Sequence, residues 1–180
     1  MVSDTQDAGG AEMILGEDFP VLSPEQLSFR VGDYSHADTP AAMGWQEALD
    51  QRYRVGVQAW LQRGKRGQNR RPYPSDGPLI FAGHNLHFRA HVTALNHVEV
   101  WWQVANTGGH ARQVQGLRGQ IFRGRDLQDR PTKDQKENWE RTAYTGSHLI
   151  RALLVRNRTV VASSDWLVVN IYSKGNGFRL

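Results

Sequence analysis

Two stretches in the middle of the chain place polar and aromatic side chains where they could bind a ligand together. Residues 86–92 and residues 98–104 both alternate apolar with polar positions, which predicts two strands with one apolar face each. Their polar faces carry His87, Arg89, His91, Glu99, Trp101 and Gln103. An aromatic ring beside Arg, His and Gln can stack on a purine and hydrogen-bond its edge, and Arg can also pair with phosphate. A purely structural interpretation stays open, in which Trp101 packs beneath Trp45 and Trp60 as a second apolar layer.

The seven histidines suggest a metal site, but their spacing argues against one. His84, His87 and His91 lie closest together, and on one strand the last two are four residues apart, about 13 Å at roughly 3.3 Å per residue. Zn–N bonds are about 2.0 Å long, so one ion cannot join them. The sequence has no HExxH motif, and we expect neither a metal nor a cofactor.

Common catalytic arrangements are also missing from the sequence. It contains no cysteine, no GxSxG nucleophile elbow, no phosphate loop GxxxxGK[ST] and no GxGxxG. Three aspartates between positions 126 and 134 lie among three arginines, an arrangement typical of a charge-balanced surface loop. We therefore expect a binding protein and no enzyme.

Charge is distributed unevenly along the 180 residues. The first 29 residues hold six of the 18 acidic side chains and none of the 22 basic ones, so the remainder carries 22 bases, 12 acids and a net charge of +10. Eighteen of the bases are Arg, which suits forked contacts with phosphate, although a GC-rich genome would give the same excess. Short apolar stretches, the lack of a secretory signal and the absence of Cys lead us to expect a cytoplasmic protein without a membrane partner.

The pattern of the chain predicts a mainly β fold, an immunoglobulin-like antiparallel β-sandwich with one N-terminal helix. Residues 1–12 are expected to be a disordered acidic head, and 173–180 a loose tail. Residues 13–78 are expected to hold a strand at 27–31, a helix from Thr39-Pro40 to about Gln62, and a basic loop at 63–78. The helix is predicted from the apolar residues that recur every three or four positions, namely Trp45, Leu49, Tyr53, Val57 and Trp60.

Residues 79–172 are expected to be the sandwich itself, within one domain with 13–78. The short link 94–97 suggests that strands 86–92 and 98–104 form an antiparallel pair, with Trp102 in the core. A short strand is expected at 117–122, a charged excursion at 123–138, and a last strand at 166–172. Strands 148–156 and 159–162 predict a hairpin whose two-residue link, Asn157-Arg158, leaves the turn type open.

Several short motifs in fixed order give the sequence a family resemblance. They are the runs Trp102–Ala111, Leu117–Ile121 and Glu140–His148, followed by Val155-Arg-Asn157, Val161-Ala162 and Asp165. Over roughly residues 79–172 the chain resembles the C-terminal sensor domain of bacterial adenylyl/guanylyl cyclases and SMODS-type nucleotidyltransferases, the AGS-C family. The chain departs from the family pattern at Arg158, where Gly is usual, and at Gln103, where a basic residue is common.

The resemblance implies a sensor in bacterial anti-phage signalling that recognises a nucleotide or cyclic nucleotide without making it. The family normally follows a nucleotidyltransferase or cyclase domain, for which this chain has no room, so it resembles a free-standing sensor or one domain of a longer polypeptide. Polar matching positions at strand ends either satisfy turn backbone or face a pocket. With the residues from the two central strands and an Arg between the motifs, the candidate ligand-binding residues are Arg89, Trp101, Gln103, Asn106, Arg112, Arg118, Gln120, Thr142 and His148.

Two other functions stay open. One is a protein-interaction module that binds a nucleotidyltransferase, a cyclase, an effector or a second copy of itself, without a small ligand. The other is nonspecific nucleic-acid binding through the basic run 63–71. We consider nucleic acid the weakest of the three, because the basic residues are not interleaved with aromatics along a continuous stripe.

Overall fold

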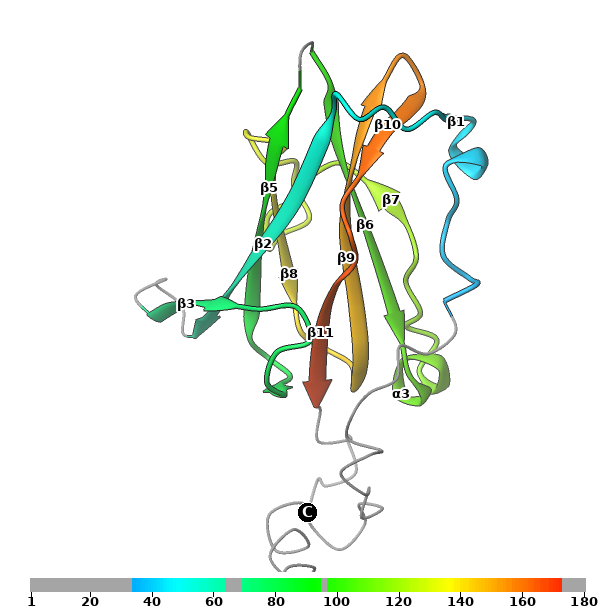
Figure 1. Ribbon diagram of the computed structural model, residues 1–180. Coiled ribbons are helices and arrows are strands. Elements are labelled where there is room, and N and C mark those ends of the chain that lie inside the picture. Colours follow the sequence, from blue (N-terminus) through cyan, green and yellow to red (C-terminus); the bar gives the residue numbers. More distant parts are fainter. Residues whose placement is uncertain (1–33, 64–68, 95–96, 173–180) are drawn as a thin grey trace, which may run out of the picture. The chain divides into compact units, whose positions relative to one another are not determined.

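The described part of the chain, residues 34–63, 69–94 and 97–172 of a computed structural model, contains two β-sheets that pack face to face (Figure 1). The seven-stranded sheet consists of β1 (Gln46–Glu47), β4 (Ile80–Phe81), β6 (Glu99–Thr107), β7 (Ile121–Phe122), β9 (Gly146–Arg156), β10 (Thr159–Ser163) and β11 (Leu167–Tyr172). The four-stranded sheet has the order β3 (Asn69–Tyr73), β2 (Arg54–Arg63), β5 (Asn85–Thr93), β8 (Glu137–Arg141). Neighbouring strands are antiparallel except β1–β10 and β4–β11, which are parallel. The predicted mainly β sandwich is thus confirmed.

The predicted helix from Thr39 to about Gln62 is wrong. Only a 3-10 turn, η1 (Ala41–Met43), is helical there, and the chain then forms β1 and the ten-residue strand β2. In β2 the residues Val55, Val57, Ala59 and Leu61 alternate toward the core, and Ala59 and Leu61 are buried. Hydrogen bonding to β5 on one side and β3 on the other explains why this segment is a strand.

Strands β5 and β6 confirm the predicted faces, but they do not pair with each other. β5 pairs with β2 and β8, whereas β6 pairs with β7 and β9 in the other sheet. The two strands belong to different sheets, and their apolar sides face each other across the core. Their polar sides consequently face away from each other, on opposite outer surfaces of the sandwich.

The core lies between the two sheets and is centred on large side chains of these two strands. Trp102 and Phe88 have no exposed surface, and their ring centroids are 6.4 Å apart. The Trp102 indole N–H donates a hydrogen bond of 3.0 Å to the Gln135 carbonyl, so the polar atom of the indole is also satisfied. The predicted core position of Trp102 is therefore confirmed.

The remaining expectations on secondary structure have mixed outcomes. The basic loop 63–78 contains β3, and the charged excursion ends in β8, which the sequence did not predict. The expected strand 117–122 is reduced to β7, the strand 166–172 is confirmed as β11, and a short helix α3 (Gly109–Gln113) follows β6. The acidic head, the strand at 27–31 and the tail at 173–180 lie outside the described residues.

The predicted hairpin between β9 and β10 is confirmed, and its turn is strained. Asn157 and Arg158 have φ angles of 49° and 60°, which are the left-handed values of a type I′ turn. Asn tolerates this conformation, whereas an Arg side chain disfavours it.

Replacing Arg158→Gly is expected to stabilise the protein by about 0.5–1 kcal/mol, because glycine adopts positive φ without a steric penalty. The expected rise in thermal midpoint is a few degrees and can be measured by calorimetry. Arg158→Ala is the control, since it also removes the guanidinium that lies beside Gly44 but keeps the Cβ atom. An equal gain in both variants would mean that the side chain, and not the backbone angle, is unfavourable.

Candidate functional site

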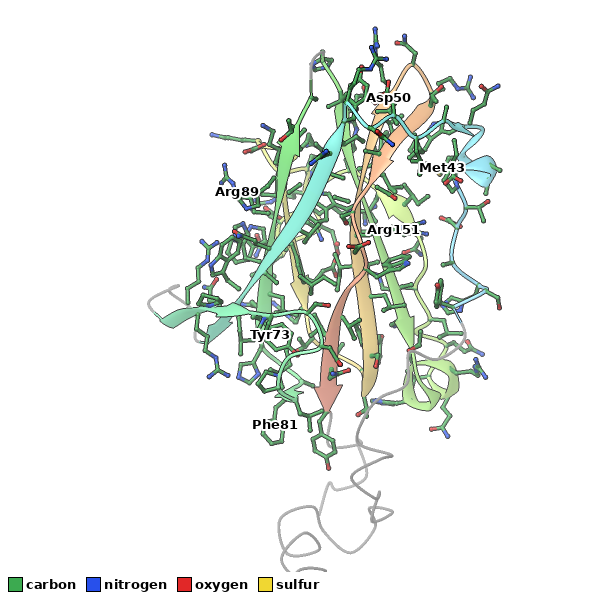
Figure 2. The ribbon with its side chains drawn as sticks, in the orientation of Figure 1. Met43, Asp50, Tyr73, Phe81, Arg89 and Arg151 are labelled. Carbon is green, nitrogen blue, oxygen red and sulfur yellow. The ribbon has the colours of Figure 1, made fainter. Side chains whose placement is uncertain are left out.

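The structure separates the candidate residues of the two central strands. Arg89 projects from the outer face of the four-stranded sheet (Figure 2), whereas Trp101 and Gln103 lie on the outer face of the seven-stranded sheet. The combined binding face expected from β5 and β6 is therefore wrong, because the two strands bury their apolar sides against each other. Arg112 on α3 and Gln120 before β7 are both exposed.

Trp101 and Gln103 are occupied by contacts within the protein. Trp45 packs edge-to-face on Trp101 with ring centroids 4.8 Å apart, as the structural interpretation expects, while Trp60 lies on the other sheet. The buried Gln103 amide donates to the Asp38 carbonyl at 2.6 Å, and its oxygen accepts a hydrogen bond of 2.9 Å from the Arg151 Nε. These contacts attach the segment before η1 to the sheet and leave little of either side chain for a ligand.

The surface of Arg89 is likewise engaged by acidic side chains. Its guanidinium forms an ion pair of 2.9 Å with Glu137 and lies 3.7 Å from the Asp134 carboxylate. Both pairs are partly exposed, so they contribute little to stability, but they neutralise the charge of this arginine.

Four of the nine candidates do meet, in a cavity of about 190 Å³ at one end of the sandwich. They come from β6, β9 and the segments that flank β7 and β8. The cavity is lined by Leu86, Val104, Asn106, Arg118, Glu140, Arg141, Thr142, Ala143, Tyr144, His148, Ile150 and Ile171. Three of these polar residues, Glu140, Arg141 and Tyr144, belong to the family motif but are not among the candidates.

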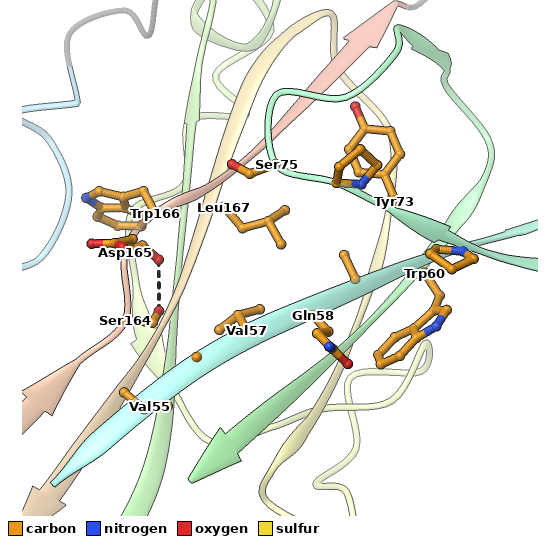
Figure 3. A pocket seen from close by; sticks show the side chains of 14 residues that line it. Val55, Val57, Gln58, Trp60, Tyr73, Ser75, Ser164, Asp165, Trp166 and Leu167 are labelled. Carbon is orange, nitrogen blue, oxygen red and sulfur yellow. Dashed lines mark hydrogen bonds between the residues drawn. The ribbon is translucent and has the colours of Figure 1, made fainter. Parts of the chain in front are cut away.

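A second hollow, a groove of about 540 Å³, contains none of the nine candidates (Figure 3). It runs between β2 and the segment 164–167, with Trp60 and Trp166 near its two ends. Its lining includes one carboxylate, on Asp165, and no Lys, Arg or His. The charge of this groove is therefore unsuited to a phosphorylated ligand.

Asn106 and Thr142 of the cavity hold backbone in place. The buried Asn106 amide donates to the Gly116 carbonyl at 2.8 Å and accepts from the Arg118 amide at 2.6 Å, which closes the loop that contains α3. The buried Thr142 hydroxyl accepts a hydrogen bond of 2.9 Å from the His84 amide and thereby ties the end of β8 to the start of β5. Asn106 therefore satisfies turn backbone and also lines the cavity, so the two expected roles are combined in one residue.

Two glycines let the ends of β6 and β9 approach each other closely beside this cavity. Gly108 and Gly146 have φ angles of 157° and 134°, and a Cβ on Gly146 would lie 2.2 Å from the Thr107 carbonyl oxygen. Any larger residue at these positions would force the strand ends apart. Close approach of the two backbones therefore accounts for both glycines.

Arg118 and Glu140 form the polar centre of the cavity. The Arg118 Nη1 lies 2.6 Å from the Glu140 Oε2, and the other carboxylate oxygen accepts a hydrogen bond of 3.1 Å from the Asn138 amide. Arg118 is half-buried, so the pair is partly shielded from solvent. It therefore offers guanidinium donors and carboxylate acceptors side by side.

His148 supplies a neutral ring to the same cavity. Burial lowers the pKa of His148 to about 4, and the nearby charge of Arg118 acts in the same direction. Its Nε2–H donates to the Tyr144 carbonyl at 3.0 Å, so Nδ1 is a hydrogen-bond acceptor at neutral pH. A guanidinium, a carboxylate and a ring acceptor among apolar walls can recognise a polar edge by hydrogen bonding.

Other kinds of site find no support in the described ranges. Within residues 34–63, 69–94 and 97–172, no three His, Cys, Asp or Glu side chains lie close enough to hold a metal ion. The helices among these residues are all too short or too polar to cross a membrane.

The sequence matches the family model described as "Adenylyl/Guanylyl and SMODS C-terminal sensor domain" over residues 33–172. This match includes all four residues that meet in the cavity and extends further toward the N-terminus than the motifs alone. A search of curated proteins finds no match.

We expect the free energy of unfolding to fall as pH decreases from about 6.5 to about 4. In this window His87 and His148, whose pKa values are lowered to about 4, stay neutral in the folded protein while the unfolded chain takes up protons. Each histidine contributes up to about 3 kcal/mol. Urea unfolding at several pH values should show a flatter dependence for His148→Gln, whereas the exposed His97→Gln should keep the original slope. An unchanged slope in His148→Gln would contradict the burial argument.

Proposed function

The chain belongs to the adenylyl/guanylyl and SMODS C-terminal sensor domain family, and on this premise we propose that it binds a nucleotide or cyclic nucleotide as a non-enzymatic sensor in bacterial anti-phage signalling. The observation that carries the proposal is the meeting of Arg118, Glu140 and His148 in one cavity. Family membership supports the sensor role, and the chemistry of the cavity supports the class of ligand.

The cavity offers the hydrogen-bonding groups that a nucleoside requires. Arg118 can donate to ring nitrogens and carbonyl groups, while Glu140 can accept from amino groups or ribose hydroxyls. His148 adds an acceptor at Nδ1, and Leu86 and Ile150 supply apolar wall. Because Arg118 and Arg141 face a single carboxylate among the lining residues, the cavity carries one excess positive charge, which favours an anionic ligand.

The size of the cavity limits how much of the ligand enters. Pockets for complete drug-sized ligands measure about 300–1,000 Å³, whereas this cavity measures about 190 Å³. It therefore suits a base or a ribose, with the phosphate remaining at the opening. A sensor of this kind recognises one end of a larger messenger.

The same residues give little support to catalysis. The Glu140 carboxylate is held by Arg118, and the Nε2–H of His148 is committed to a backbone carbonyl. The Thr142 hydroxyl is committed to backbone in the same way. Acyl or phosphoryl transfer needs at least a general base beside a free nucleophile. His148 keeps a lone pair at Nδ1, but the Thr142 hydroxyl and the Glu140 carboxylate are already engaged, so these three side chains do not form such a pair.

An alternative function is docking to a linked or separate nucleotidyltransferase or cyclase domain. It is favoured by Leu79 and Phe81, two neighbouring apolar side chains at β4 that are 45% and 55% exposed. The two functions are compatible, because a sensor must pass its signal to another protein surface.

Thermal shift with mono-, di- and cyclic nucleotides, followed by calorimetric titration of any compound that raises the melting temperature, tests the proposal. We expect Arg118→Gln and Glu140→Gln each to lower affinity about tenfold or more, because each removes a hydrogen bond to a charged group. Arg112→Gln, an exposed arginine outside the cavity, is the matched control and should bind normally. A flat response to the whole panel, or equal losses at positions 112 and 118, would refute the assignment of the cavity.

A further inference from the structure

A row of stacked rings crosses the outer face of the four-stranded sheet, away from the cavity. Trp60 of β2 is directly opposite His87 of β5, which is directly opposite Trp139 of β8. The ring centroids are 5.5 Å and 4.3 Å apart, with interplanar angles of 30° and 36°. The Arg70 guanidinium lies 4.3 Å from the Trp60 ring and covers that end of the row. Aromatic rings from three strands and a cation from a fourth thus form one continuous stack.

The middle ring of the row contains a polar group that the protein leaves unsatisfied. His87 is 3% exposed, and the Arg70 Nη2 lies 2.5 Å from its Nδ1. Since Arg can only donate, Nδ1 accepts and Nε2 carries the hydrogen. Nε2 is buried without a hydrogen-bond partner, because the nearest carboxylate oxygen, on Glu137, is 3.8 Å away. Burial lowers the pKa of His87 to about 4, so this contact is not an ion pair at neutral pH.

Two guanidinium groups flank the rings on the adjacent row of the sheet. The register of the four strands places Arg70, Gln62, Asn85 and Arg141 side by side, one row along from the aromatic rings. At about 4.8 Å per strand, the Cα atoms at the two ends of this row are about 14 Å apart. Both arginines are exposed, and among the described residues neither forms an ion pair. The face therefore combines aromatic rings, side-chain amides and uncompensated positive charge.

We propose that this surface, the stacking face formed by Trp60, His87, Trp139, Arg70 and Arg141, binds single-stranded nucleic acid. Unpaired bases stack on aromatic side chains in any sequence, while arginine neutralises the phosphates beside them. Trp60 and Trp139 are half-buried, whereas His87 is buried between them and Arg70 covers the Trp60 end. Trp139 is therefore the ring left at the open end of the row, and a base can reach it only when that base is unpaired. An acidic peptide would satisfy the arginines but would make no use of the rings.

The stacking face could not be predicted from the sequence, because its rings and arginines lie on different strands and are not close together along the chain. Positions 60, 87 and 139 become neighbours only through strand register. The inference is also independent of the proposed nucleotide sensor, because Trp60, Trp139 and Arg70 do not line the cavity. Arg141 lines the cavity as well, so it is left out of the test.

Fluorescence anisotropy of labelled ten-nucleotide DNA and RNA of mixed sequence, measured at 50 and 200 mM salt, tests the inference. We expect binding that weakens with salt, as counterion release requires, and a loss of about fivefold or more in Trp139→Ala. Trp139→Phe keeps a ring and should retain most of the affinity, which also separates lost stacking from lost folding. Arg70→Gln should reduce the slope of log affinity against log salt by about 0.7.

Two matched controls keep the result separate from the cavity. Trp166→Ala removes a half-buried tryptophan that packs on Arg151 elsewhere in the sandwich, and Arg118→Gln alters the cavity. Both should bind the oligonucleotides normally. The inference is overturned if no binding occurs at 50 mM salt, if a duplex or poly-glutamate binds as tightly as the single strand, or if Trp139→Ala binds like the unchanged protein.

Discussion

The burial of the apolar sides of β5 and β6 against each other is the constraint on which the rest of the structure depends. Trp102 and Phe88 fill the space between the sheets and have no exposed surface. Truncating a buried ring of this size typically costs about 3–5 kcal/mol, so the orientation of each strand about its own axis is fixed. Because side chains alternate, that orientation determines which residues reach the outer face of each sheet, and hence that the polar sides of β5 and β6 cannot share a ligand.

Local patterns in the sequence were sufficient to predict a strand and its buried face where one face of the strand is apolar and the other is polar. This holds for β5, for β6 and for the hairpin of β9 and β10. They were misleading for β2. Trp45, Tyr53 and Trp60 have the spacing of one helix face. Over nearly the same residues, the alternating spacing of a strand is found at Val55, Val57, Ala59 and Leu61. What decides between the two is pairing with β3 and β5, and the β5 partners, which are 23 to 39 positions away, are invisible to a local pattern. Gly56 weakened the helix prediction but did not favour a strand, because glycine is unfavourable inside both.

The candidate site was only partly predictable for a related physical reason. Asn106, Arg118, Thr142 and His148 could be selected because they are polar and stand at strand ends within a recognisable motif. Glu140 was missed because β8 places Asn138 and Glu140 on its inward side, so the strand shows no apolar alternation by which its faces could be assigned. A strand whose buried side is polar is stabilised by specific hydrogen bonds and leaves little trace in hydropathy.

Two adjacent residues of β8, Trp139 and Glu140, belong to the two different surfaces proposed to bind ligands. Glu140 points inward and pairs with Arg118, so a ligand in the cavity is selected mainly by hydrogen-bond geometry. Trp139 points outward beside uncompensated arginines, so a ligand on the stacking face is held by ring contact and by charge, and its affinity depends steeply on ionic strength. The dependence of affinity on salt should therefore be steeper for an oligonucleotide on the stacking face than for a nucleotide in the cavity. This distinction follows from strand alternation, which directs Glu140 and Trp139 to opposite faces of β8.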